Sequence, residues 1–150
     1  MEQVKFDLGQ ISQQWATALE AMPDLRRTIL DAAGDEMLAM VRHGIGGTGK
    51  AQHWQEKRLG SKGGYVAVRP SGQDLYSGGN YQMHITTAIE NDHRIRQPTG
   101  TAKRYVQRIR VRKVPGKYMY RAANSDLPAV AGRYAQQLGE TLARRLEGKG

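Results

Sequence analysis

Apolar residues recur at helical spacing in the first third of the chain. One stripe fits an amphipathic helix that Pro23 interrupts, and its members are Ile11, Trp15, Ala18, Leu19 and Met22. A second helix is predicted to begin at Pro23 and Asp24, because proline suits the first turn of a helix, and to end at Gly44. Its apolar face consists of Leu25, Ile29, Ala33, Met37, Met40 and Val41. We therefore expect two N-terminal helices.

A third stripe lies near the end of the chain, where apolar residues are four positions apart. Its members are Val130, Tyr134, Leu138, Leu142 and Leu146, while Arg133, Arg144 and Arg145 lie away from this seam. Residues Lys117–Asn124 predict a short helix, after which Asp126 is expected to cap the longer one. Gly148 suits the C-terminal end of the long helix.

Strands are predicted in the middle of the chain. Tyr65–Pro70 has the composition of a strand, and apolar and polar residues alternate throughout Tyr81–Glu90. Asn91 and Asp92 follow as turn formers that tolerate left-handed backbone. Tyr105–Val114 alternates as well, so that one side of this strand carries an arginine ladder of Arg108, Arg110 and Arg112.

Glycine-rich segments separate these elements. Residues Gly44–Gly64 predict a long flexible connection around a short segment anchored by Trp54, and Ser71–Asn80 reads as a turn-rich excursion. The order of elements indicates an α+β fold and one domain over residues 1–150. We expect N-terminal helices, a small, mainly antiparallel β-sheet with a long glycine-rich loop, and a long C-terminal helix packed on the sheet.

The composition narrows the class of protein. The chain has 150 residues, of which 39% are hydrophobic, and no cysteine, so disulfides, thiolate metal sites and a cysteine nucleophile are excluded. No apolar run approaches the roughly 18 residues of a membrane span, and the first ten residues lack the pattern of a signal peptide. We therefore expect a soluble protein that is not exported and has no membrane partner.

Charge is distributed unevenly along the sequence. The formal net charge is +9 and the sequence pI is about 10.0, which raises the hypothesis of a polyanionic partner. Ten Lys and Arg but no acidic residue lie between Asp92 and Asp126, whereas the first 36 residues hold seven acidic residues and three basic ones. The basic and acidic residues therefore belong to different parts of the chain.

The arginine ladder has three interpretations. It could follow nucleic-acid phosphates, form the solvated face of a sheet, or meet an acidic surface on a neighbouring subunit, for which the acidic first helices are an available partner. We favour the third interpretation, followed by DNA passing close by, because aromatic residues near the ladder are sparse. The candidate residues for a subunit interface or a DNA-facing surface are Trp54, Arg94, Arg96, Arg104, Arg108, Arg110, Arg112 and Lys113.

Catalytic chemistry finds no positive support in the sequence. The segment Gly44–Ala51 spaces its glycines and Lys50 as a phosphate-binding loop does, but Ala51 replaces the magnesium-binding hydroxyl and the segment follows a predicted helix instead of a strand. The four histidines, His43, His53, His84 and His93, do not have the spacing of a zinc site. We expect no catalytic residue, no metal and no cofactor, and we rank an enzyme behind an assembly protein and a nucleic-acid-binding module.

Three short motifs follow one another along the chain. The first is Thr48-Gly49. The second is a predicted strand end with a Glu before a turn, Ile89-Glu90-Asn91-Asp92-His93-Arg94-Ile95. The third is Val114-Pro115-Gly116, which leads into the C-terminal helix. Their order resembles a known family, the neck or minor tail-component proteins of long-tailed bacteriophages, although the chain has Asp92 where many relatives carry glycine.

The resemblance implies a structural subunit and no catalysis. It implies assembly with other copies of the chain as a ring in the virion neck or tail-completion region, made in the host bacterial cytoplasm. The neighbours would be the head-closure or portal-side proteins and the tail-tube or tail-terminator proteins, with packaged DNA close by. Such a ring needs a heterologous interface, whose register opposed acidic and basic surfaces can set.

Overall fold

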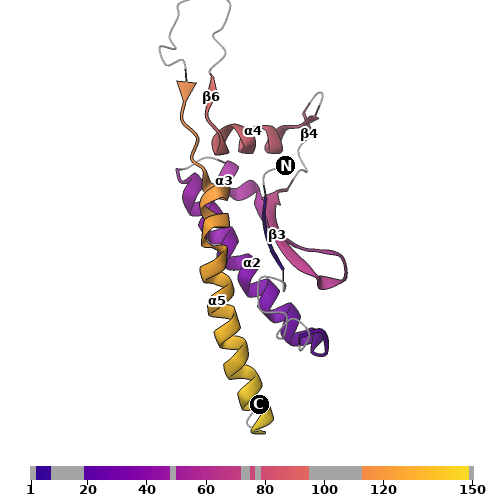
Figure 1. Cartoon of the computed structure of the whole chain (residues 1–150). Coiled ribbons are helices and arrows are strands. Elements are labelled where there is room, and N and C mark those ends of the chain that lie inside the picture. Colours follow the sequence, from indigo (N-terminus) through magenta and orange to yellow (C-terminus); the bar gives the residue numbers. More distant parts are fainter. Residues whose placement is uncertain are drawn as a thin grey trace, which may run out of the picture.

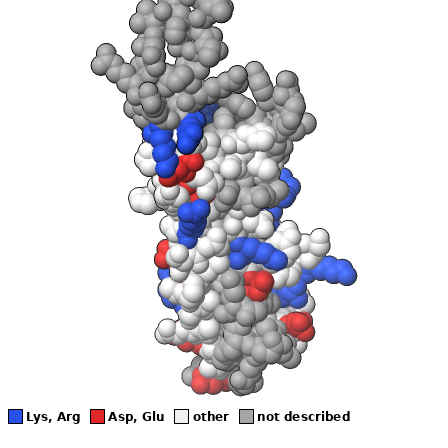
Figure 2. Space-filling model, turned by 45° about the horizontal axis from the view of Figure 1, so that its top comes forward, with Lys and Arg blue, Asp and Glu red and all other residues white. Residues whose placement is uncertain are grey.

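The computed structural model describes residues 3–7, 19–47, 50–71, 75–76, 79–94 and 113–148, and the other residues are grey in Figures 1 and 2. The helices are α2 (Pro23–Ile45), α3 (Ala51–Trp54), α4 (Tyr81–Glu90) and α5 (Met119–Leu146), with a single 3₁₀ turn at Ser61–Gly63. The strands are β1 (Val4–Asp7), β2 (Gln55–Leu59), β3 (Tyr65–Pro70), β4 (Leu75–Tyr76), β5 (Gly79–Asn80), β6 (His93–Arg94) and β7 (Lys113–Val114). The α+β prediction is confirmed.

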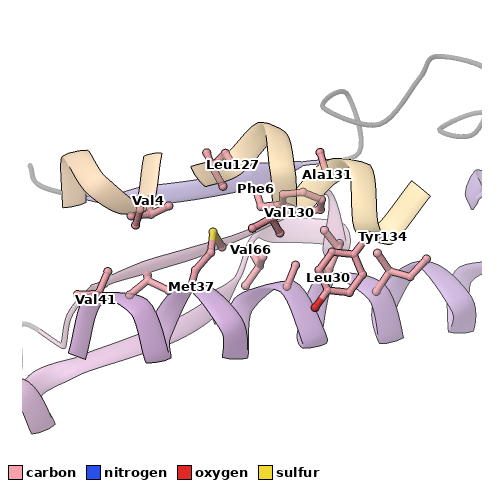
Figure 3. Close-up of a cluster of buried hydrophobic side chains, with 14 of the residues drawn as sticks. Val4, Phe6, Leu30, Met37, Val41, Val66, Leu127, Val130, Ala131 and Tyr134 are labelled. Atoms are coloured by element: carbon pink, nitrogen blue, oxygen red, sulfur yellow. The ribbon is translucent and has the colours of Figure 1, made fainter. Parts of the chain in front are cut away.

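The largest sheet has three antiparallel strands in the order β1-β3-β2. Val4 pairs with Val68 and Phe6 with Val66, so that these four buried side chains lie on one face of the sheet. The two long helices, α2 and α5, pack beside each other and over this apolar face (Figures 1 and 3). One layer of helices on one small sheet therefore encloses the core.

Apolar residues at helical spacing supply the helix side of this core. In α2 they include Leu30, Met37 and Val41, and in α5 they include Val130 and Leu138, all of them almost fully buried (Figure 3). Close contact between α2 and the sheet needs a residue without a side chain. A Cβ atom on Gly34 would lie 2.5 Å from the Lys57 side chain and 2.6 Å from that of Val66.

Three sequence predictions are confirmed closely. The second predicted helix is α2, although it ends at Ile45, followed by Gly46 with φ +63°, and not at Gly44. Residues Tyr65–Pro70 form β3 as predicted. In the C-terminal seam Val130, Tyr134 and Leu138 are buried and Leu142 is partly buried. They belong to α5, which ends at Leu146 near Gly148 with φ +70°. The stripe before Pro23 lies outside the described residues, apart from Leu19, which is buried, and Met22, which is partly buried.

The strand predicted at Tyr81–Glu90 is wrong, because these residues form the helix α4. The buried side chains of α4 are polar and four residues apart, at Gln82, Thr86 and Glu90. Hydrophobic alternation therefore misled the prediction, since the apolar Ile85 and Ile89 are only partly buried.

The long flexible connection predicted at Gly44–Gly64 is wrong for most of its length. It contains α3 and the strand β2, which forms a hairpin with β3. The strand was missed because its inward positions, Gln55 and Lys57, are polar and find partners in the fold. Strand β1 was missed as well, since four residues are too short to give a clear period.

The division of the C-terminal region into two helices is also wrong. α5 is continuous from Met119 to Leu146, with Asp126 and Pro128 inside it. Asp126 therefore caps no helix. Asn91 and Asp92 lie between α4 and β6, where the chain turns as predicted, and neither residue has a positive φ. In the described part of the chain no helix is long and apolar enough to cross a membrane.

Candidate functional site: the root of the basic arm

Strands β6 and β7 are the described ends of a strongly basic segment. His93 pairs with Val114 and Arg94 with Lys113, so the chain leaves and returns at one place (Figure 1). We call residues 93–114 the basic arm. They contain eight Lys and Arg and no acidic residue, and therefore account for eight of the nine net positive charges of the chain. The rest of the protein is nearly neutral.

We call residues 89–94 and 113–118, which lie at the base of the arm, its root. A buried carboxylate at the end of α4 holds these two segments together. The Glu90 side chain is fully buried, and its two oxygens accept hydrogen bonds from the backbone N–H groups of Tyr120 at 2.9 Å and Arg121 at 3.1 Å. These N–H groups belong to the first turn of α5 and have no partner within the helix. Glu90 thus caps α5 from 30 residues away, and its negative charge lies at the positive end of the helix dipole.

The backbone on both sides of the arm is joined directly. The Lys117 N–H donates to the Ile89 carbonyl at 2.8 Å, and the Tyr118 N–H donates to the Glu90 carbonyl at 3.1 Å. Tyr118 has φ +50°, a left-handed conformation that turns the chain into α5. Gly116 packs on the same backbone, where a Cβ atom would lie 2.3 Å from the Glu90 carbonyl oxygen. Only glycine fits this contact.

The exposed Asp92 side chain also connects the two segments of the root. Its Oδ1 accepts the Gly116 N–H at 2.8 Å and the Tyr118 hydroxyl, and its Oδ2 contacts the Lys113 ammonium at 2.8 Å. The Gly116 hydrogen bond, followed by those of Lys113 and Tyr118, holds the pKa of this carboxyl well below its ordinary range. The bond with Asp92 raises the pKa of both Lys113 and Tyr118. Figure 2 shows basic and acidic side chains next to one another at this end of the molecule.

A buried polar network places α4 against the rest of the fold. The Gln55 side chain donates to the Ala51 carbonyl and to the Thr86 hydroxyl, both at 3.1 Å, and accepts from the Tyr120 hydroxyl. The Ser71 hydroxyl bonds to the Gln82 side chain at the other end of α4. Because buried polar groups are costly to leave unpaired, this network fixes the orientation of α4 and with it the position of Glu90, at the start of the described root.

The lowered pKa of Asp92 predicts that the protein becomes less stable in acid. A folded-state pKa below the unfolded value of about 3.9 adds stability that is present above that value and is lost as the pH falls. We expect the free energy of unfolding to fall more steeply between about pH 5 and pH 2 in the wild type than in Asp92→Asn. Urea unfolding at several pH values measures both slopes.

Asp126→Asn is the matched control, because Asp126 is an exposed carboxylate of α5 with no hydrogen bond or ion pair in the described part of the chain. The free energy of unfolding of Asp126→Asn should fall with decreasing pH as steeply as that of the wild type. Equal slopes for the wild type and Asp92→Asn would contradict the role given to Asp92.

The structure places three of the eight candidate interface residues. Arg94 and Lys113 are exposed at the root, with Lys113 paired to Asp92. Trp54 is half-buried and packs against the core, so it belongs partly to the fold. The other five candidates lie outside the described residues, and they are Arg96, Arg104, Arg108, Arg110 and Arg112. Sequence reasoning missed Glu90 as a cap and Gly116 as a contact, although both lie in the motifs that carry the family resemblance.

Acidic residues of α2 already have partners in the same chain. The Lys57 ammonium lies 2.7 Å from Asp31 and 2.5 Å from Asp35, and Arg133 pairs with Glu36. Such exposed pairs contribute only about 0.2–1 kcal/mol each, so they do not prevent other contacts. They do reduce the acidic surface that α2 offers to the arm of a neighbouring copy.

Metal and nucleotide chemistry gain no support from the geometry. No group of three or more His, Asp or Glu side chains is placed to hold a metal ion in the ranges that the structure describes. The segment that resembles a phosphate-binding loop follows the helix α2, as the sequence indicated, and Lys50 is exposed. Comparison with protein-family models, with curated proteins and with solved structures found no match to this chain.

Proposed function

We propose that the protein is a structural subunit of the neck or tail-completion region of a tailed bacteriophage. It assembles as a ring that joins the portal or head-closure side of the particle to the tail tube or tail terminator. It is made in the host cytoplasm and becomes part of the virion, and it carries no catalytic site. Its partners are further copies of the chain and the proteins above and below the ring.

The observation that carries this proposal is the meeting of two motifs that first suggested the family. Residues 89–94 and 113–118 are far apart in the sequence, yet Glu90, Asp92 and Gly116 join them at the root of the arm. These residues bond to backbone and to neighbouring side chains of the described chain. Such a fixed root suits an element that is presented to a neighbouring subunit in an assembly.

Deleting the gene from the phage that encodes it tests the proposal. We expect DNA-filled heads and separate tails in electron micrographs, because the joint between them would be missing. Supplying the wild-type protein in trans should restore complete particles. Normal joined particles from the deletion would rule out a role in head-tail joining.

A nucleic-acid-binding module is the second candidate, and the concentration of charge in the arm favours it. If the arm neutralises phosphates, the purified protein should bind DNA with an affinity that falls steeply as salt rises. Light scattering at low and high salt, with and without DNA, separates the two functions. A closed oligomer or a monomer indifferent to DNA supports the assembly subunit, whereas tight, salt-sensitive binding by a monomer supports the module.

A further inference from the structure

A groove of about 430 Å³ lies between the start of α2 and the turn of the β2–β3 hairpin. Its apolar part comes from Pro23, Leu30 and Leu59. Leu30 is fully buried, whereas Leu59 is 36% exposed and is the single large apolar side chain that is exposed in the described ranges. An exposed leucine beside a preformed depression differs from the other large apolar side chains of the described residues, which are at least partly covered.

Arg26 fixes the shape of this groove. Its Nε donates to the Gly63 carbonyl at 2.7 Å and its Nη2 to the Lys62 carbonyl at 3.0 Å, so α2 is tied to the hairpin turn. Lys62 and Gly63 both have positive φ values, of 60° and 63°, which closes the turn tightly. A groove whose walls are already bonded together loses little conformational entropy when it binds a partner.

Basic residues surround the apolar part, and none of the described residues that line it is acidic. Arg26, Arg27 and Lys62 all line the groove, and no ion pair involves them within the described residues. The other side of the hairpin continues this charge, since Lys5 and Arg69 line a second cleft of about 310 Å³, where the described lining residues also include no acidic one. The end of the hairpin is therefore basic on both sides and lies apart from the basic arm.

The chemistry of the groove selects among possible occupants. A phosphate backbone could use the cations but offers no aliphatic side chain for Leu59 and Pro23. A symmetric contact with a second copy would bring Arg27 and Lys62 against the same cations, and the described part of the chain shows no other large exposed apolar side chain to insert. An acidic segment with an apolar anchor satisfies both features.

We infer that this groove binds an acidic segment of a different protein, which seats an apolar side chain against Pro23 and Leu59 and places carboxylates on Arg27 and Lys62. The inference goes beyond the proposed function, because it uses the groove alone. It does not depend on the arm, on ring formation or on DNA.

The test is a titration of the ¹⁵N-labelled full-length protein followed by backbone amide resonances. The probe is a peptide of about twelve residues with repeated Glu-Glu-Leu, compared with the same peptide carrying Gln for Glu and with a single-stranded DNA of similar length. We expect the acidic peptide at up to about 1 mM to shift the amides of Leu30, Leu59 and Gly63. The Gln peptide should bind about tenfold more weakly.

Matched variants test whether the peptide binds in the groove. Arg27→Gln/Lys62→Gln should weaken the acidic peptide about tenfold, and Leu59→Ala should weaken both peptides. The control Lys50→Gln/Arg144→Gln removes the same charge from exposed residues outside the groove and outside the basic arm, and should bind like the wild type. Equal melting temperatures exclude unfolding as the cause.

Two outcomes would overturn the inference. One is the absence of shifts at the groove amides with the acidic peptide, or equal binding of the acidic and Gln peptides. The other is stronger binding of the DNA at the same amides, which would make the groove a nucleic-acid contact. Neither outcome bears on whether the gene is needed for head-tail joining.

Discussion

Glu90→Ala is expected to lower the free energy of unfolding by about 3 kcal/mol, a drop of roughly 6–12 °C in melting temperature for a chain of this size. The variant leaves two N–H groups of the first turn of α5 without their acceptor, and the one from Tyr120 is buried. It also opens a cavity at a fully buried side chain. Urea unfolding followed by circular dichroism measures the loss.

Two further variants separate capping from the loss of charge or volume. Glu90→Gln keeps one acceptor oxygen and most of the volume, so it should lose clearly less stability than Glu90→Ala. Glu140→Ala removes an exposed carboxylate from α5 and should stay within about 0.5 kcal/mol of the wild type. If Glu90→Ala lost no more stability than Glu140→Ala, the cap would contribute nothing.

The elements that sequence reasoning predicted well are those with a long, apolar period. α2 and the C-terminal seam each repeat over several turns, so the buried face can be read from spacing alone. β3 has valines at two of its buried positions, Val66 and Val68, which face the helices. In these elements the side chains that face the core are apolar, and the sequence pattern reports burial directly.

The prediction failed where polar side chains are buried. α4 turns Gln82, Thr86 and Glu90 inward, and β2 does the same with Gln55. Each of these groups has a partner that is distant in the sequence, such as Thr86 for Gln55 and Tyr120 for Glu90. Hydropathy cannot identify a buried polar face, because its energy comes from contacts that exist only in the folded chain.

Only part of the candidate site was predicted, because its long-range contacts are not visible in the hydropathy pattern either. Its basic residues Arg94 and Lys113 were selected from the charge pattern, which is visible in the sequence. The residues that hold them in place were given roles only within their own segment. Glu90 was predicted to end a strand and Asp92 to form a turn. Their actual partners, from Lys113 to Arg121, lie 21 or more residues away. Long-range hydrogen bonds of this kind leave no local signature.

Gly116→Ala is expected to cost about 2–3 kcal/mol of stability and to loosen the root of the arm. The new Cβ would lie 2.3 Å from the Glu90 carbonyl oxygen and 2.6 Å from the carbonyl carbon of Asn91. Both atoms are backbone, so no side chain can rotate away to relieve the clash. Separation of the two segments would instead stretch the bonds from Lys117 to Ile89 and from Tyr118 to Glu90.

Gly132→Ala is the control, and it should change stability in the opposite direction. Gly132 lies on the exposed face of α5, and a Cβ there meets nothing within 4 Å. Alanine is therefore expected to stabilise the protein by about 0.4–1 kcal/mol, because it restricts the unfolded chain and favours the helix. Gly116 has no positive φ, so steric contact and not backbone strain opposes its substitution. Hydrogen exchange at the Lys117 and Tyr118 amides would locate any loosening that Gly116→Ala causes. Equal effects of the two substitutions on stability would contradict the close packing of Gly116 on α4.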